Sequence, residues 1–411
     1  IIIGSSQDFQ PSAPDVAGGD RRAINWRATA NTQGVAPGRR VLQLAVRIEP
    51  RGNLRIVREQ PVRVAPQEIP ADPARSSVQP LSAAELARLA SRAALLLREH
   101  QSEHGYWLTA YTKSLRYEEP HQEMNTFLTA TLIDYLRPVA GKFGLGDVVE
   151  RARTHLDGQI EETGLVRYHG RVDGPAIGKW CYPITPDSDD TALAWRISGR
   201  SPADPRFGPM MKVLAAYRDS RGLYRTWLAP RSEYVNLDPG LDPNPTDIGI
   251  QVNICLMLDQ LAPGAARDLS KALERARGSG DLWIYYSQAP LLPYLRIAEL
   301  RQRGYDISVP VERLALPAPG QDIWSEAAFR LVQQELRSQS AKGTDVIASL
   351  LARLGRDDFA RIRANPPLLY HNDRSATVDR YYWSEDFGYA LWLRLYDVAR
   401  RETPGGEEPA R

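Results

Sequence analysis

Three carboxylates stand within four residues of one another, at Asp187, Asp189 and Asp190. They follow Thr185-Pro186, a pair suited to the cap and first position of a helix, and precede Leu193–Ile197, which we interpret as helical. Acids crowded at the mouth of a helix cannot all ionise cheaply once buried, because desolvation and mutual repulsion both favour the neutral form. We therefore expect one of the three to keep its proton at neutral pH and to donate it.

Polar side chains also open other predicted helices. If these helices line a ring in parallel, their first residues converge near the acidic run. Each residue taken singly is equally well explained as a helix cap or a first-turn acid, which helices generally favour. The candidates for the site are Glu123, Asn125, Asp247, Asn253 and Glu385.

Aromatic residues fall at or near the loop ends of the predicted helices. Aromatic faces stabilise cations by roughly 0.5–2 kcal/mol per contact, although they also stack on sugars or simply pack in a core. Trp180 and Tyr182 flank the acidic run and are the best candidates to line a cavity, and Trp383 precedes the last predicted helix.

A glycine followed by apolar or aromatic residues recurs at Gly105, Gly164, Gly222 and Gly280. By subtraction the spacings are 59, 58 and 58 residues. A fixed period of this size indicates stacked supersecondary units. Each unit contains one amphipathic helix and a second, more apolar helix.

The apolar set is predicted to form the inner layer: Glu123–Leu136, Asp187–Ile197, Thr246–Leu258, Leu291–Leu300 and Trp383–Ala399. The outer layer is predicted at Ser82–Glu99, Asp147–Ile160, Pro209–Tyr217, Ala265–Ala276, Ser325–Leu336 and Asp345–Leu354. Solenoid repeats are usually joined by short loops, whereas the loops here are long, aromatic and polar. The fold class is therefore mainly α, an α/α toroid of helical hairpins around a lined cavity, with a small β-rich N-terminal segment.

The toroid is expected to span residues 81–402. Residues 1–80 form a β-rich extension, in which Val41–Glu49 and Leu54–Val64 read as a hairpin around a Pro-Gly turn, followed by the proline-rich linker Pro66–Pro80. Residues 403–411 read as a disordered tail.

Composition limits the kinds of partner that the protein is expected to bind. The 52 basic and 50 acidic residues give a net charge of +2, which excludes a strong field for nucleic acid. The two cysteines, Cys181 and Cys255, fit a reducing compartment, so we expect a cytoplasmic protein. No uninterrupted apolar run approaches the length of a membrane span, which leaves peripheral membrane association as the form of membrane contact. No histidine or cysteine spacing predicts a metal site.

The run Asp187–Ala192 resembles the DxDDTA signature of class II terpene cyclases, and Gln101–Trp107 resembles the QW motif of the same superfamily. The resemblance implies an α/α toroid that protonates a linear isoprenoid or prenyl diphosphate and cyclises the cation. It makes Asp189 the proton donor, with Asp187 and Asp190 raising its pKa and orienting it. No cofactor is implied for the chemistry, although Mg²⁺ would accompany a diphosphate substrate. Cyclases of this class usually have two helical domains, whereas one is predicted here.

Two other functions fit the same fold. A carbohydrate-active toroid would use two carboxyl groups across a groove as acid and base, Asp189 with Asp247 or Glu385. A non-catalytic toroid would use the cavity to bind a ligand or a partner.

Overall fold

The computed structural model describes residues 38–48, 53–64, 80–237, 244–276, 282–286, 289–307, 322–336, 344–372 and 376–402. The chain divides into two compact units, Ile1–Ser76 and Ser77–Arg411. In the first unit, strands β1 (Gly38–Ile48) and β2 (Asn53–Val64) pair antiparallel, with Gly38 opposite Val64. They form the β-rich N-terminal segment that the sequence predicts. The proline-rich linker, apart from Pro80, and the expected tail at 403–411 lie outside the described residues.

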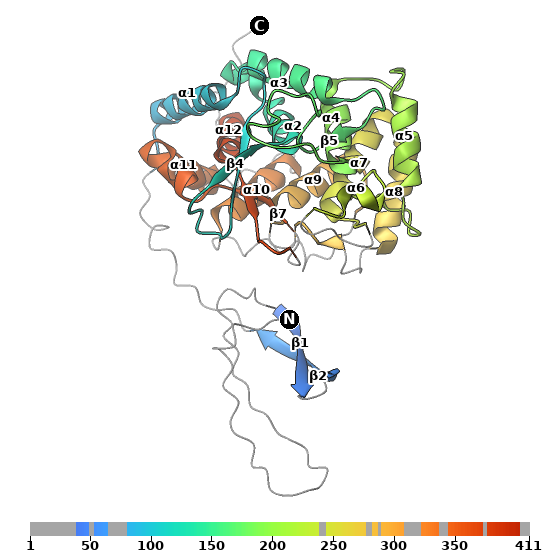
Figure 1. Ribbon diagram of the computed structural model, residues 1–411. Helices are drawn as coiled ribbons and strands as arrows, with labels where there is room; N and C mark the ends of the chain where they lie inside the picture. Colours follow the sequence, from blue (N-terminus) through green and yellow to red (C-terminus); the bar gives the residue numbers. More distant parts are fainter. Residues whose placement is uncertain are drawn as a thin grey trace, which may run out of the picture. The chain divides into compact units, whose positions relative to one another are not determined.

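Six helices of the second unit close into an inner ring (Figure 1). In ring order they are α2 (Thr126–Leu136), α4 (Ser188–Ser198), α7 (Ile248–Leu261), α9 (Leu291–Gln302), α10 (Ile323–Leu336) and α12 (Glu385–Glu402). Each packs against the next, and α12 returns to pack against α2. Every residue of α2 and α4 is buried. A helix without a polar face must be covered on all sides, and the outer layer of helices provides that cover.

The outer layer consists of α1 (Ala83–His100), α3 (Gly146–Gln159), α5 (Phe207–Ala216), α8 (Pro263–Ala276) and α11 (Thr344–Ala364). Helix α1 packs on α11 and α12, α3 on α2 and α4, α8 on α7, and α11 on α10 and α12. Helix α5 contributes Phe207, whose ring lies edge-on to Trp195 of α4 at 5.6 Å. This arrangement is the α/α toroid that the sequence predicts.

The prediction that Ser325–Leu336 belongs to the outer layer is wrong. Helix α10 packs between α9 and α12 in the inner ring. Its residues Ala327, Ala328 and Leu331 are at most 1% exposed. Small and branched apolar side chains on this face let three inner helices approach one another, which a helical period alone does not reveal.

Short strands lie at the ends of the inner helices. A four-stranded antiparallel sheet has the order β4 (His121–Met124), β3 (Leu108–Thr112), β8 (Tyr381–Trp383) and β7 (Leu368–His371). Pairing of β3 with β8 joins the first and last parts of the toroid, with Ala110 opposite Trp383. Strand β5 (Val166–Arg167) pairs with β6 (Pro186–Asp187) beside the acidic run. Short helices within the described residues also include Ala140–Phe143, a 3₁₀ turn, and α6 (Arg231–Tyr234).

The predicted helix Glu123–Leu136 begins later than expected. Residues 121–124 form β4, and α2 begins at Thr126 with Asn125 as its N-cap, whose side chain accepts from the backbone N–H of Leu128 at 2.9 Å. The polar side chains of Glu123 and Asn125 therefore stand on extended backbone at the mouth of the ring.

Two of the repeated glycines, Gly105 and Gly164, are required where one helical hairpin touches the next. Gly105 has φ +93°, and a Cβ there would lie 2.5 Å from the carbonyl oxygen of Arg151 on α3. Gly164 has φ +80°, and its Cβ would lie 2.5 Å from the carbonyl oxygen of Arg206, next to α5. Both the left-handed backbone and the close approach exclude other residues. Gly105 and Gly164 thus mark turns at which one helical hairpin packs closely against the next, whereas Gly280 lies outside the described residues.

A search of the helices within the described residues finds none with the length and apolar character needed to cross a membrane.

Candidate active site

The acidic run forms the N-terminus of α4. Asp187, on β6, has extended backbone and caps the helix, its Oδ1 accepting from the backbone N–H of Asp190 at 2.8 Å. The expectation that Thr185 caps this helix is therefore wrong. Pro186 and Asp187 belong to strand β6, so the helix begins at Ser188. Pairing with β5 keeps Pro186 extended and moves the cap to the first acid.

Asp189 is one of two acids in this run whose neutral form is favoured at neutral pH. It is 8% exposed, and its Oδ1 accepts a hydrogen bond from Asn253 Nδ2 of α7 at 2.8 Å. Burial, followed by the nearby Asp190 charge, raises the pKa of Asp189 to about 8. The Asn253 hydrogen bond opposes this rise without overcoming it. A carboxylic acid in this state can donate a proton into the ring at pH 7.

The pKa values of the other two acids, Asp187 and Asp190, are also raised. Burial and then Asp190 raise the pKa of Asp187 well above its usual range. Burial raises the pKa of Asp190 to about 6, although a hydrogen bond donated by Thr126 Oγ1 opposes the rise. Burial therefore favours the neutral form at both positions, and it does so more strongly at Asp187. The sequence predicts one retained proton, whereas burial favours the neutral form at two of the three acids, Asp187 and Asp189.

The acids open into a cavity of about 400 Å³. Both Asp187 and Asp190 line it together with Asp189, as does Ile250 of α7. Eight of the 21 residues that line it are Phe, Tyr or Trp: Phe127, Tyr168, Tyr182, Trp227, Tyr285, Tyr286, Tyr370 and Tyr382. The rings of Tyr370 and Tyr382 stack with centroids 4.5 Å apart. Burial raises the pKa of Tyr168, Tyr286 and Tyr370 well above the usual range, so these hydroxyls stay neutral beside the acids.

Several residues singled out from the sequence meet here. Glu123 and Tyr182 line the cavity with the three acids. Asn125 and Asn253 stand behind the wall: Asn125 Nδ2 donates to Tyr168 Oη at 2.8 Å, and Asn253 holds Asp189. Tyr182 is 66% exposed and so forms part of the rim.

Four other residues expected at the site lie outside the cavity. Trp180 packs on a small cluster that includes Tyr106 and Cys181. Trp383 is buried, with the ring of Tyr117 edge-on at 5.5 Å. Glu385 accepts a hydrogen bond from Tyr389 at 3.2 Å.

The fourth is Asp247, the N-cap of α7. Its Oδ1 accepts from the backbone N–H of Gly249 at 2.9 Å, and its Oδ2 accepts from those of Ile284 and Tyr285 at 2.7 and 2.9 Å. Asp247 thereby holds the loop that carries Tyr285 and Tyr286. Burial raises its pKa to about 7.

Sequence reasoning missed Tyr168, His169 and Tyr370 as cavity residues. Tyr168 and His169 directly follow β5, the strand that pairs with β6 next to the acids. Recognising that Gly164-Leu165-Val166 begins this strand would have placed the next two polar side chains beside the acidic run. Tyr370 lies on β7, which reaches the site only through sheet pairing with β8.

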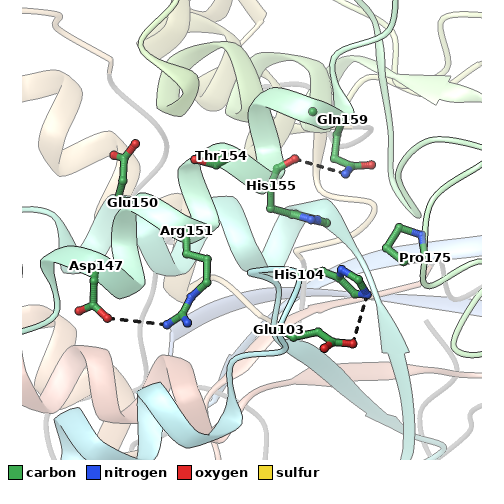
Figure 2. Close-up of a pocket in the computed structure, with 10 residues that line it drawn as sticks. Glu103, His104, Asp147, Glu150, Arg151, Thr154, His155, Gln159 and Pro175 are labelled. Carbon is green, nitrogen blue, oxygen red and sulfur yellow. Dashed lines mark hydrogen bonds and ion pairs between the residues drawn. The ribbon is translucent and has the colours of Figure 1, made fainter.

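A second hollow lies on the outer surface beside α3 (Figure 2). This open groove of about 620 Å³ is lined by Glu103, His104, Asp147, Arg151 and His155, among others. Its charged groups pair with one another: His104 Nε2 lies 3.6 Å from Glu103 Oε1, and Arg151 Nη2 lies 3.9 Å from Asp147 Oδ2. None of the three helix-mouth acids lines it, so the smaller cavity is the candidate active site. Within the residues that the structure describes, no group of three or more His, Cys, Asp or Glu side chains is arranged to hold a metal ion.

No known family profile matches the chain, and no curated protein sequence does. Similar solved structures include the type II terpene cyclase MstE from Scytonema without ligand, at 15% identity and TM-score 0.49, covering 78% of this chain and 100% of that one. A variant of MstE bound to geranylgeranyl dihydroxybenzoate is 14% identical with a TM-score of 0.48, and the match covers 77% of this chain and 97% of that one. A protein from Actinoplanes is 14% identical with a TM-score of 0.45, and the match covers 76% of this chain and 99% of that one. The closed ring itself is established by helix packing within this chain.

Proposed function

We propose that this protein is a class II terpene cyclase, in which Asp189 protonates a double bond of a linear isoprenoid and the cavity folds the chain for ring closure. The observation that carries the proposal is a neutral carboxylic acid, Asp189, exposed to an aromatic-walled cavity. An alkene is a very weak base, so its protonation needs an acid that is kept dry and ready.

The three acids have complementary roles in this reaction. Asp189 gives its proton to one carbon of the double bond, and the π electron pair forms the new C–H bond. The Asp190 carboxylate, held by Thr126, supplies the negative charge that favours cation formation nearby. Asp187 is neutral and fixes Asp190 through the helix cap. Asn253 holds the Asp189 carboxyl in one orientation.

The aromatic walls suit the cation that follows. Eight aromatic side chains line the cavity, and each contact between a cation and a ring face contributes roughly 0.5–2 kcal/mol. Neutral tyrosines supply these faces without presenting a nucleophilic phenolate that would trap the cation.

The two carboxyl groups that the sequence pairs with Asp189 for glycoside hydrolysis, those of Asp247 and Glu385, are not placed for that reaction. A glycosidase needs a second carboxyl group facing Asp189 across a groove. Asp247 has both oxygens bound to backbone N–H groups and Glu385 lies away from the cavity, so neither supplies it.

The direct test is product formation from a panel of isoprenoids that differ in head-group charge. The basic side chains among the described residues of the cavity wall are Arg380, His169 and His371, which could contact an anionic head group. The panel therefore contains two diphosphates, geranylgeranyl diphosphate and farnesyl diphosphate, together with a geranylgeranyl hydroxybenzoate and the uncharged squalene. Each substrate is tested with and without Mg²⁺. We expect cyclic isomers of at least one substrate, detected by mass spectrometry, and none with Asp189→Asn. Cyclic product in equal yield from the variant would refute the assignment.

A further inference from the structure

Arg380 is the one arginine or lysine among the described residues that line the cavity. Four carboxyl groups line the same space, those of Glu123, Asp187, Asp189 and Asp190. The guanidinium of Arg380 is partly buried, yet it forms no ion pair with these four groups or with any other carboxyl group of the described residues. A cation that loses part of its hydration without gaining an ion pair favours an anionic ligand.

The backbone at Arg380 is held by Asn372, which follows β7 and also lines the cavity. The backbone N–H of Arg380 donates to Asn372 Oδ1 at 2.7 Å, and the backbone N–H of Asn372 donates to the carbonyl oxygen of Arg380 at 3.0 Å. Asn372 Nδ2 also donates to the carbonyl oxygen of Val378 at 2.8 Å. These bonds fix the backbone directly before β8, from which the arginine side chain extends.

The side chain of Arg380 packs on a row of tyrosines. Its Cζ lies over the ring of Tyr111 on β3, 5.8 Å from the ring centroid. The ring of Tyr111 lies 5.4 Å from that of Tyr382, which stacks on Tyr370 at 4.5 Å. The last two rings line the cavity. A contact through a ring face leaves the N–H groups, which lie in the plane of the guanidinium, available to an acceptor.

The charges on the wall favour a head group with one negative charge. The fork of a guanidinium matches the two oxygens of a carboxylate through two parallel hydrogen bonds. A diphosphate carries several negative charges, of which the one guanidinium balances a single charge, while the four carboxyl groups of the wall offer it no attraction. The described wall is therefore better matched to a carboxylate than to a diphosphate.

We propose that Arg380 binds a carboxylate at one end of the substrate, so that the substrate is an isoprenoid with a single carboxylate head group. This inference rests on the proposed function and deepens it. The head group binds beside β8, while Asp189 at the start of α4 protonates a double bond elsewhere in the chain. No bond of the head group forms or breaks, so Arg380 binds and orients the substrate and takes no part in proton transfer.

Substrates that differ only in the head group test this inference on the full chain. Geranylgeranoic acid carries a carboxylate, its methyl ester is uncharged, and geranylgeranyl diphosphate with and without Mg²⁺ supplies the alternative anion. We expect kcat/KM for the acid to exceed that for the ester by about 10- to 100-fold, the range for a charge-assisted hydrogen bond, with most of the difference in KM. Equal values for acid and ester, or a higher value for the diphosphate, would overturn the carboxylate assignment and leave class II cyclisation in place.

Variants at Arg380 connect the preference to this side chain. Arg380→Gln should lower kcat/KM for the acid by about tenfold or more and leave the ester within about twofold of its wild-type value. Arg380→Lys keeps the charge without the fork and should give an intermediate value for the acid. Because the ester reports the fold and the proton donor, an equal loss for acid and ester in both variants would contradict head-group binding.

Arg171 provides the matched control. Its Nε lies 3.0 Å from Asp173 Oδ1, and it does not line this cavity. Arg171→Gln removes a guanidinium that already has a carboxylate partner, so it should change kcat/KM for neither the acid nor the ester. A loss confined to the acid in this variant would show that the preference does not depend on the cavity wall.

Binding without turnover separates this inference from the proposed function. In the Asp189→Asn protein, titration calorimetry should show the acid binding about tenfold or more tightly than its ester, and adding Arg380→Gln should remove the difference. If the acid binds in this way but the wild-type protein cyclises no substrate, the proposed function fails and the carboxylate site stands. If cyclisation occurs and the acid gains nothing from Arg380, the function stands and this inference fails.

Discussion

Asn253 Nδ2 on α7 donates a hydrogen bond to Asp189 Oδ1 on α4 across 2.8 Å. The two residues belong to adjacent helices of the inner ring, which pack directly on each other. This contact holds the proposed acid in one orientation and at the same time limits the rise of its pKa. Stability and acidity at this site are therefore linked, and both can be measured.

Asp189→Asn should abolish cyclisation and stabilise the fold. Between pH 4 and pH 8 the folded protein holds a proton on Asp189 that the unfolded chain has released, since the pKa is about 8 in the fold against 3.8 as a reference. The free energy of unfolding therefore falls as the pH rises through this window, by up to about 1.4 kcal/mol per pH unit. Asn keeps the oxygen that Asn253 binds and lacks this dependence. In urea unfolding, the free energy of unfolding of the variant relative to that of the wild type should increase by a few kcal/mol between pH 5 and pH 8. An equal difference between the two proteins at both pH values would contradict the raised pKa of Asp189.

The alkaline limb of the activity profile should report Asp189. Because the acid must be protonated, kcat/KM should decline tenfold per pH unit above about pH 8. Asp190→Asn removes a charge that raises the pKa of Asp189, so its limb should move to lower pH. Profiles measured for both proteins on one substrate check the direction, and an upward shift in the variant contradicts the assignment.

Asn253→Leu should slow the reaction and move the alkaline limb of the activity profile to higher pH. Loss of the hydrogen bond removes the influence that lowers the pKa of Asp189, so the limb moves to higher pH. One hydrogen bond contributes about 1–1.5 kcal/mol, so we expect kcat to fall about tenfold. Cys255→Ala on the same helix, where Sγ contacts the Ala266 carbonyl oxygen at 3.7 Å, is the control that should retain the wild-type profile.

Asp247→Ala should act through the loop that Asp247 holds. It removes the acceptor for the backbone N–H groups of Ile284 and Tyr285, at 2.7 and 2.9 Å. Leaving these groups unpaired should cost about 2–4 kcal/mol of stability. Hydrogen exchange at residues 284–286 should accelerate more than exchange in α4. Unchanged exchange in this loop would argue against an anchoring role.

Gly249→Ala should reshape the cavity wall. A Cβ at this position would lie 2.1 Å from Cε2 of Tyr286, so the tyrosine ring has to move. We expect an altered ratio of cyclic products together with a lower melting temperature, because Tyr286 lines the cavity. Gly158→Ala on α3, where a Cβ meets nothing within 4 Å, is the matched control and should change neither quantity. An unchanged product ratio for Gly249→Ala would remove Tyr286 from the shaping of the substrate.

The sequence by itself determined the helical units, their glycine turns and the place of the acidic run at a helix mouth. These features depend on local chemistry: apolar spacing, left-handed turns and the preference of short polar residues for helix caps, although the cap is Asp187 and not Thr185. Helix α10 was assigned to the wrong layer because its period does not say which neighbours it has. Asp247 and Glu385 were expected at the site because they open inner helices, but the side chains point to backbone N–H groups and to Tyr389 instead.

Only the tertiary structure decided which residues face the acids and how strongly the acids hold their protons. The pKa of Asp189 rises mainly by burial, which exists only once the ring is closed. Asn253, Tyr370 and His169 come to the site from other helices and strands, through packing of α4 on α7 and pairing of β5 with β6 and β7 with β8. Desolvation and contacts between distant segments are properties of the packed ring, and no stretch of the sequence carries them alone.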